Sequence, residues 1–230
     1  LPFSFMTKGA SLDLERVEVL KGPQGTLYGR NTTGGAINYI VNKPTDTLSW
    51  GASGTYSRFE TTEVSAFVSG PITERLRARI AIKDMQSRKG WQKSVSRPDD
   101  ELGTVDRQAL RALAEWTPTD TLDVRLSFDM WRDRSEAQTP QAIAVIPQNP
   151  FTGAAVQSPR VENAELVPVD TDDNRIADWS NEFDWHLNDK FMGGALNLRW
   201  SITDDLSLTS ISSYGDARSD GSMLPAGLDA

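Results

Sequence analysis

Apolar and polar residues alternate along much of the chain beyond residue 47. In residues 48–57 the even positions include Leu48, Trp50 and Tyr56, whereas every odd position is serine, glycine or threonine. In residues 122–131 the even positions are leucine, valine, phenylalanine and methionine, and the odd positions are polar apart from the last. Because successive side chains of a strand point to opposite faces, this period of two predicts amphipathic β-strands.

The same alternation recurs in about seven segments. These segments are residues 48–57, 62–69, 76–88, 110–116, 122–131, 192–202 and 206–215. Short connections at 70–75, 117–121 and 203–205 contrast with long ones at 89–103 and 134–181. Short turns at one end and long loops at the other are typical of transmembrane β-barrels. The sequence therefore predicts a mostly β fold, with about seven antiparallel strands of an incomplete transmembrane β-barrel.

Charged residues on one face of these strands suggest a wet environment for that face. In a barrel this face would line the lumen while the aliphatic face contacts lipid, whereas in a soluble β-sandwich it would face solvent. The lumen-facing candidates are Arg77, Arg79, Arg111, Glu115, Asp123 and Arg125. Aromatic residues near the strand ends, Trp50, Trp116, Trp200 and Tyr214, fit the interfacial positions of a barrel, although a sandwich core also uses tryptophan.

A glycine-rich stretch precedes the long strands. Residues 16–19 alternate as a short, half-buried strand, and residues 36–41 form a second apolar strand. Between them, glycines recur at positions that require positive φ or close backbone approach. These glycines are Gly22, Gly25, Gly29, Gly34 and Gly35. Such a connection is expected to have a fixed shape.

The stretch 14–44 resembles the C-terminal part of the plug domain of TonB-dependent outer-membrane receptors. The plug motif residues, for which the resemblance implies a structural or gating role, are Glu15, Arg16, Glu18, Gly22, Pro23, Gly25, Tyr28, Gly29, Gly34, Gly35 and Asn38. The resemblance implies that residues 1–44 are the C-terminal part of a plug and residues 45–230 the N-terminal part of its surrounding barrel. We expect both parts to be truncated, with the signal peptide and the TonB-binding segment before residue 1.

The resemblance also implies a function. Such receptors take up a scarce nutrient, most often an iron–siderophore complex, across the Gram-negative outer membrane, driven by the TonB complex of the inner membrane. Ligand would meet the outer loops 89–103 and 134–181 and a plug apex formed by Lys8, Gly9, Ala10, Ser11 and Leu12. Arg16 and Glu18 could pair with lumen-facing charges and so hold the plug. A passive channel or adhesin barrel, and a soluble β-sandwich binding module, are the alternatives.

Composition excludes several other classes of function. The net charge of −8 over 230 residues offers no basic stripe for nucleic acid. The chain has no cysteine, and its single histidine, His186, cannot make a zinc site alone. The acidic run at 170–174 begins like a calcium loop, but arginine stands where the glycine belongs. We therefore expect no enzyme activity, no cofactor and no metal site; the expected partners are the TonB complex, a ferric siderophore and outer-membrane lipid.

Overall fold

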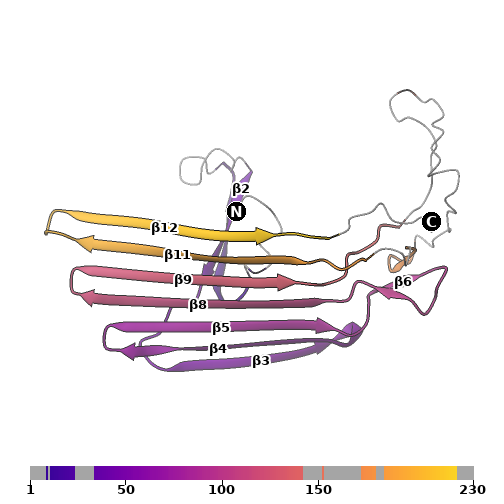
Figure 1. The fold of residues 1–230 in the computed structure, drawn as a ribbon, viewed down its shortest axis with the longest axis horizontal. Coiled ribbons are helices and arrows are strands. Elements are labelled where there is room, and N and C mark those ends of the chain that lie inside the picture. Colours follow the sequence, from indigo (N-terminus) through magenta and orange to yellow (C-terminus); the bar gives the residue numbers. More distant parts are fainter. Residues whose placement is uncertain are drawn as a thin grey trace.

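The framework of the protein is a seven-stranded antiparallel sheet, seen in a computed structural model. The structure describes residues 9, 11–23, 34–141, 152, 172–179 and 184–221. The long strands are β3 (Ser49–Ser57), β4 (Thr61–Thr73), β5 (Leu76–Ser87), β8 (Asp106–Thr119), β9 (Leu122–Asp133), β11 (Asp189–Ser201) and β12 (Ser207–Arg218). They lie in the order β12-β11-β9-β8-β5-β4-β3, so each long strand pairs with its neighbours in the sequence (Figure 1). The predicted antiparallel strands are confirmed, and within the described residues the sheet is open, with β3 and β12 at its edges.

Two of the strands continue through a proline, past the point where the alternation ends. β4 runs on through Pro71, and β8 through Pro118, so that only two residues separate each strand from the next one. Proline has no backbone N–H to give to the ladder, and it breaks the alternating pattern in the sequence. The ladder accommodates both prolines through register irregularities, between Pro71 and Thr73 and between Trp116 and Thr119.

Apart from the irregular ends near Pro71 and Trp116, the pairing register places the even-numbered residues of the long strands on one face. Ile82 pairs with Leu110, Leu110 with Met130, and Met130 with Met192, which makes a continuous apolar row across four strands. The large apolar side chains that this face exposes are Trp50, Tyr56, Val64, Val68, Ile80, Ile82, Trp116, Leu126, Phe128, Met130, Met192, Leu196, Trp200, Leu208 and Tyr214. An apolar face of this extent is expected where a protein contacts lipid or another protein.

Three tryptophans lie on this face near the end of the sheet where the short turns connect the strands. Trp50 lies at the start of β3, and Trp116 and Trp200 lie near the ends of β8 and β11. Tyr214 lies opposite Gly194, well away from the turns. Among the helices of the described residues, none is long and apolar enough to cross a membrane.

The glycine-rich stretch forms a separate antiparallel hairpin of β1 (Leu14–Lys21) and β2 (Gly35–Val41). The hairpin stands across the direction of the long strands (Figure 1). Gly22 has φ +82° and Gly35 has φ +139°, and a Cβ at Gly35 would lie 2.4 Å from the Leu20 carbonyl oxygen. A side chain is therefore excluded at Gly35, as the pattern predicts.

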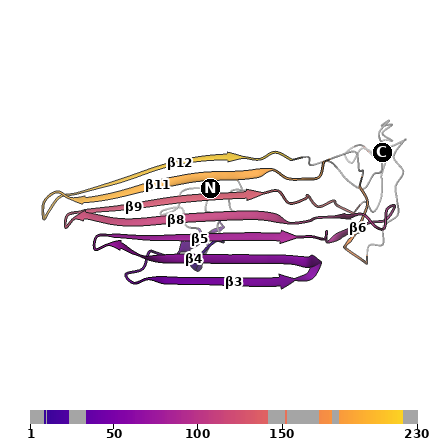
Figure 2. The same cartoon turned by 60° about the horizontal axis from the view of Figure 1, so that its bottom comes forward.

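The long loops are joined by a three-stranded sheet that the alternation does not predict. It contains β6 (Gln92–Ser94), β7 (Glu101–Leu102) and β10 (Ile176–Ala177) in the order β10-β6-β7. β6 lies beyond the ends of the long strands, opposite the short turns (Figure 2). A buried apolar cluster of Leu102, Ala177, Trp179 and Trp185 supports this sheet.

Buried polar contacts fix the same two loops to each other. The Asp178 carboxylate accepts hydrogen bonds from the hydroxyls of Ser94, at 2.7 Å, and Ser96, at 2.8 Å. The Gln92 side chain exchanges two hydrogen bonds with the backbone of Thr139. Strands of two or three residues are too short to show a period, so only the structure brings these segments together.

Replacing Trp179 by alanine should loosen this loop sheet. Trp179 is 2% exposed, and removing a buried tryptophan side chain costs about 3–5 kcal/mol. We expect trypsin to cleave the Trp179→Ala variant after Lys93 at least about tenfold faster than wild type, because that loss raises the open population of the sheet. Trp50→Ala, which truncates a 76%-exposed side chain at the other end of the sheet, is the control. Equal cleavage of all three proteins would contradict the prediction.

Candidate functional site

The described residues before β1 lie against the charged face of the large sheet. Asp13 immediately precedes β1, and both of its carboxylate oxygens accept hydrogen bonds of 2.6 Å from the Arg79 guanidinium on β5. The two side chains are only 7% and 5% exposed. Asn42, just after β2, donates a 3.0 Å hydrogen bond to the same carboxylate. A buried, bidentate ion pair thus joins the base of the hairpin to the sheet.

A second arginine holds the neighbouring backbone. Arg111 on β8 donates one hydrogen bond to the carbonyl of Leu12 and another, of 2.6 Å, to the carboxylate of Asp129. Leu12 is 4% exposed, and a Cβ at Gly9 would lie 2.3 Å from the Trp131 ring. The chain therefore passes so close to the sheet at Gly9 that only glycine fits beside Trp131. We call the contact of Gly9 and residues 11–13 with Arg79 and Arg111 the plug anchor.

The electrostatics of the plug anchor keep Asp13 ionised. Burial by itself would raise the pKa of the Asp13 carboxyl, because it penalises the charged form. The hydrogen bonds from Arg79 and Asn42 and the positive charges of Arg79 and Arg111 outweigh burial, and the pKa of Asp13 lies below its ordinary value. Arg79 also stacks on Phe67, with the guanidinium carbon 4.0 Å from the ring centroid, which fixes its orientation.

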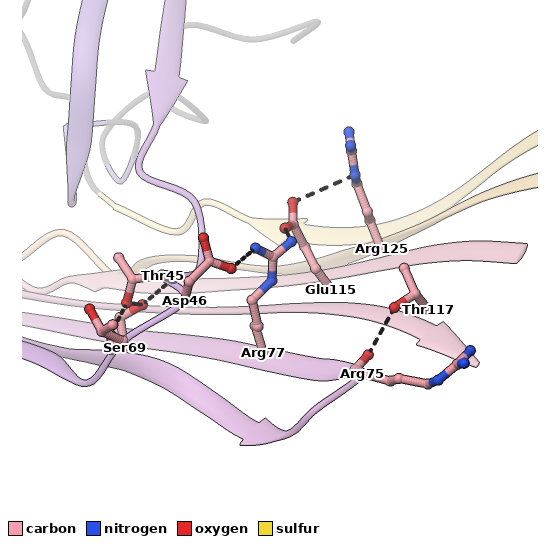
Figure 3. Close-up of polar contacts among 9 residues, drawn as sticks. Thr45, Asp46, Ser69, Arg75, Arg77, Glu115, Thr117 and Arg125 are labelled. Carbon is pink, nitrogen blue, oxygen red and sulfur yellow. Dashed lines mark hydrogen bonds and ion pairs between the residues drawn. The ribbon is translucent and has the colours of Figure 1, made fainter. Parts of the chain in front are cut away.

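A second, more exposed network ties the segment after β2 to the sheet (Figure 3). Asp46 pairs with Arg77, whose guanidinium also donates to Glu115 at 3.0 Å. Glu115 in turn lies 3.5 Å from the guanidinium of Arg125. The backbone N–H and the hydroxyl of Thr45 each make a 2.9 Å hydrogen bond to the Ser69 hydroxyl, and the Thr117 N–H donates to the Arg75 carbonyl. The Asp46 end of this network is solvated, since the Asp46 side chain is 84% exposed.

The six charged residues expected to face the lumen all lie on the odd-numbered face, the face that carries the hairpin. Arg79 and Arg111 belong to the plug anchor, and Arg77, Glu115 and Arg125 belong to the exposed network. Asp123 lies on the same face, opposite Arg199 near the short turns.

The pairing expected of Arg16 and Glu18 with the lumen-facing charges of the sheet is not seen among the described residues. Within the described residues, Arg16 pairs with its strand neighbours Glu15 and Glu18 rather than with the sheet. Arg16 and Glu18 belong to a strand that stands across the long strands (Figure 1), whereas Asp13 lies at the base of that strand, where the chain reaches the sheet. The sequence signal for this role was that Asp13 is an acidic residue directly before the motif strand. Only the structure shows that its partner is Arg79.

The other motif residues have mixed outcomes. Glu15, Glu18 and Asn38 lie on the two strands of the hairpin, and Gly22, Pro23 and Gly34 lie at the strand ends that face the connection. The expected half-burial of the first strand is wrong for its valines, since Val17 is 49% and Val19 62% exposed. The motif and apex residues Lys8, Ala10, Gly25, Tyr28 and Gly29 lie outside the described residues. Gly9, Ser11 and Leu12 of the expected apex line small cavities against the sheet.

The described residues of the loops form no metal site. Among the described residues, no group of three or more histidine, aspartate or glutamate side chains could hold a metal ion. His186 is 60% exposed and lies 2.8 Å from the Asp184 carboxylate, whose pKa this contact lowers through hydrogen bonds from the His186 backbone and ring. Of the acidic run, Asp173 accepts a hydrogen bond from the Arg175 N–H, and Asp170 and Thr171 lie outside the described residues.

Known proteins resemble the chain most clearly in the hairpin region. The TonB-dependent receptor plug domain matches residues 5–36. The pesticin receptor of Yersinia pestis is 39% identical over 67 residues, which are 29% of this chain and 10% of that protein. The ferric enterobactin receptor PirA of Pseudomonas aeruginosa is 35% identical over 74 residues, again 29% of this chain and 10% of that protein. The matched part thus spans a tenth of the length of these relatives.

Solved structures resemble the chain over most of its length. The siderophore receptor PiuA of Acinetobacter baumannii matches with a TM-score of 0.66 and 16% identity, covering 90% of this chain and 26% of that one. The ferric yersiniabactin uptake receptor FyuA of Yersinia pestis matches with a TM-score of 0.59 and 20% identity, covering 90% and 29%. These likenesses establish the fold of the long strands. Residues 5–36 are thus similar to the plug domain of TonB-dependent receptors, and the long strands share the fold of these solved receptor structures.

Proposed function

We propose that the chain is part of a receptor that takes up a scarce nutrient across the Gram-negative outer membrane, driven by the TonB complex. The cargo that we propose is an iron–siderophore complex, because the relatives include a ferric enterobactin receptor and a ferric yersiniabactin uptake receptor. The observation that carries the proposal is the plug anchor: a plug segment docked on the charged face of a sheet whose other face is apolar.

This geometry favours gated uptake over the alternatives. A passive channel has no use for a segment held across its wet face by a buried ion pair. A soluble sandwich needs two sheets packed face to face, but the seven long strands of the described residues form one sheet, and its apolar face is exposed. The exposed apolar face is suited to outer-membrane lipid, with the charged face toward the lumen.

We assign residues 1–44 to the plug and residues 45–230 to the barrel. Thr45 and Asp46 support this boundary, because they are the first residues after β2 to bind the long strands through their own side chains. β3 begins three residues after Asp46. The motif residues of the hairpin would then transmit the pull of TonB to the plug anchor.

The plug anchor is the contact that a pull on the plug must break. Separating a buried ion pair leaves an unpaired charge in a poorly solvated site, and removing one partner of such a pair costs about 3–5 kcal/mol. The solvated network around Asp46 is much weaker, since exposed ion pairs contribute about 0–1 kcal/mol. We therefore propose that Asp13 and Arg79 hold the plug in place, and that the segment 45–46 acts as the hinge that stays attached.

Growth on defined iron sources tests the proposed uptake. A strain that lacks its other siderophore receptors and expresses the full-length receptor should grow on at least one ferric siderophore, and growth should require a functional TonB complex. A panel of catecholate, hydroxamate and phenolate siderophores, haem and cobalamin identifies the cargo. Growth without TonB would instead favour the passive channel.

Replacing Asp13 by asparagine should weaken the plug anchor. The neutral amide of the Asp13→Asn variant cannot neutralise the buried Arg79, so we expect the plug to lose about 3–5 kcal/mol of local stability. Hydrogen exchange at the amides of β1 in the intact receptor measures this loss. Asp46→Asn, which removes an exposed partner, is the matched control and should change exchange by less than about 1 kcal/mol. Equal protection in the Asp13 variant and wild type would refute the role of Asp13.

The pH dependence of the same protection follows from the lowered pKa of Asp13. A carboxyl whose pKa is lower in the folded state stabilises that state above its unfolded pKa of about 3.9, and the stabilisation is lost as pH falls through the folded pKa. Protection of β1, corrected for intrinsic exchange, should therefore stay constant from pH 7 to about pH 5 and fall below about pH 4. In Asp13→Asn this loss should be absent. A loss of the same size in that variant would assign the effect to another group.

A further inference from the structure

A row of cations crosses the apolar face of the sheet at its margin near the long loops. Gln108 pairs in register with Arg132, Arg132 with Lys190, and Lys190 with Arg218. All four residues have even numbers, so they lie on the apolar face, one step beyond the row of Leu110, Met130 and Met192. We call Arg132, Lys190 and Arg218 the cationic row.

The cationic row is not explained by pairing within the sheet. Among the described residues, no carboxylate lies within ion-pair distance of Arg132 or Lys190, and both side chains are exposed. Arg218 lies 3.4 Å from Asp216, so three cations share one carboxylate. One step nearer the loops, by contrast, Arg134 pairs with Asp106 at 3.0 Å. Like charges on directly opposed positions of neighbouring strands repel one another, so the row does not exist to stabilise the sheet.

A groove lies beside the cationic row. Its volume is about 690 Å³, and the side chains that line it are apolar toward the middle of the sheet and charged toward the loops. The apolar side is made by Ile82, Leu110, Met130 and Met192, and Asp216 continues this row beside Met192. The charged side includes Arg132, Lys190 and Arg218. This division of polarity matches a molecule that carries an anionic head and a hydrocarbon tail.

The depth of the row matches a lipid headgroup. Along β9, Leu122 to Met130 are eight residues apart, or about 27 Å at the rise of an antiparallel strand. A strand tilted by about 45° then spans about 19 Å of the membrane normal, close to the apolar band of about 25 Å in outer-membrane barrels. Trp116 and Trp200 lie at the short-turn border of this band, and Arg132 lies just past the opposite border.

We propose that the cationic row and its groove bind a phosphorylated lipid of the membrane leaflet on the long-loop side. Guanidinium groups suit this task because they bind phosphate oxygens through two parallel hydrogen bonds. Lys190, between the two arginines, adds a third positive charge, and the apolar half of the groove receives an acyl chain. The inference rests on the proposed function, which places the apolar face in the outer membrane.

Native mass spectrometry of the full-length receptor in detergent tests the proposal. The probes are dioleoyl phosphatidic acid, which carries a phosphomonoester, dioleoyl phosphatidylcholine, which is zwitterionic, and inorganic phosphate. Wild type should bind phosphatidic acid at least about tenfold more tightly than phosphatidylcholine, and R132Q/K190Q/R218Q should lose that preference. Raising the salt concentration should weaken the binding, since the contact is largely electrostatic. Arg199→Gln, on the charged face, is the control and should retain the preference.

Each outcome decides the proposal. If wild type shows no preference for phosphatidic acid, or if the triple variant keeps it, the proposal is wrong. If inorganic phosphate competes as well as the lipid, the row is a simple anion site and the lipid assignment is wrong. Should the triple variant fail to fold, as seen from its gel mobility before and after heating, Arg132→Gln and Lys190→Gln are measured singly and should each lose about threefold. Growth on ferric siderophores is scored separately, so a receptor that binds the lipid without supporting growth refutes the proposed uptake alone.

Discussion

The constraint on which the structure depends is the register of the large sheet. Each strand alternates its side chains between two faces, so a slip of one residue between two strands would exchange the apolar and charged faces of everything that follows. The pairing keeps even residues together from β3 to β12, and the register irregularities at Pro71 and Trp116 lie at the short-turn ends, outside the continuous band. In this band β4, β5, β8, β9 and β11 are paired with a neighbouring strand on both sides, as a strand surrounded by lipid would need to be.

The two faces support different kinds of contact. The apolar face makes its contacts over a wide area with a polar margin, and no single side chain dominates them. On the charged face a few arginines carry the specific contacts: Arg79 and Arg111 bind the segment before the hairpin, and Arg77 binds the segment after it. Burial separates these contacts in strength, because the Asp13–Arg79 pair is closed to solvent and the Asp46–Arg77 pair is open.

The sequence predicts the long strands well and the contacts between distant segments poorly. Alternation over ten or more residues is a strong local signal, and the resemblance of residues 14–44 predicts a plug beside a sheet. The short strands β6, β7 and β10 have no such signal, because two or three residues show no period. The alternation predicts that Arg79 and Arg111, the sheet residues of the plug anchor, lie on the charged face. Asp13 does not, because its role depends on where a crossing hairpin touches the sheet, a contact between residues 66 apart in the chain.

The small sheet between the long loops has a consequence for how these loops move. β6 pairs with β7 from its own loop and with β10 from the other, while Leu102 and Trp179 share one apolar cluster. Within the described residues, the two loop segments cannot separate without breaking the hydrogen bonds between β6 and β10 and exposing Leu102 and Trp179. Segments joined in this way open and close as a cooperative unit. The described parts of the two loops are thus expected to move together rather than independently.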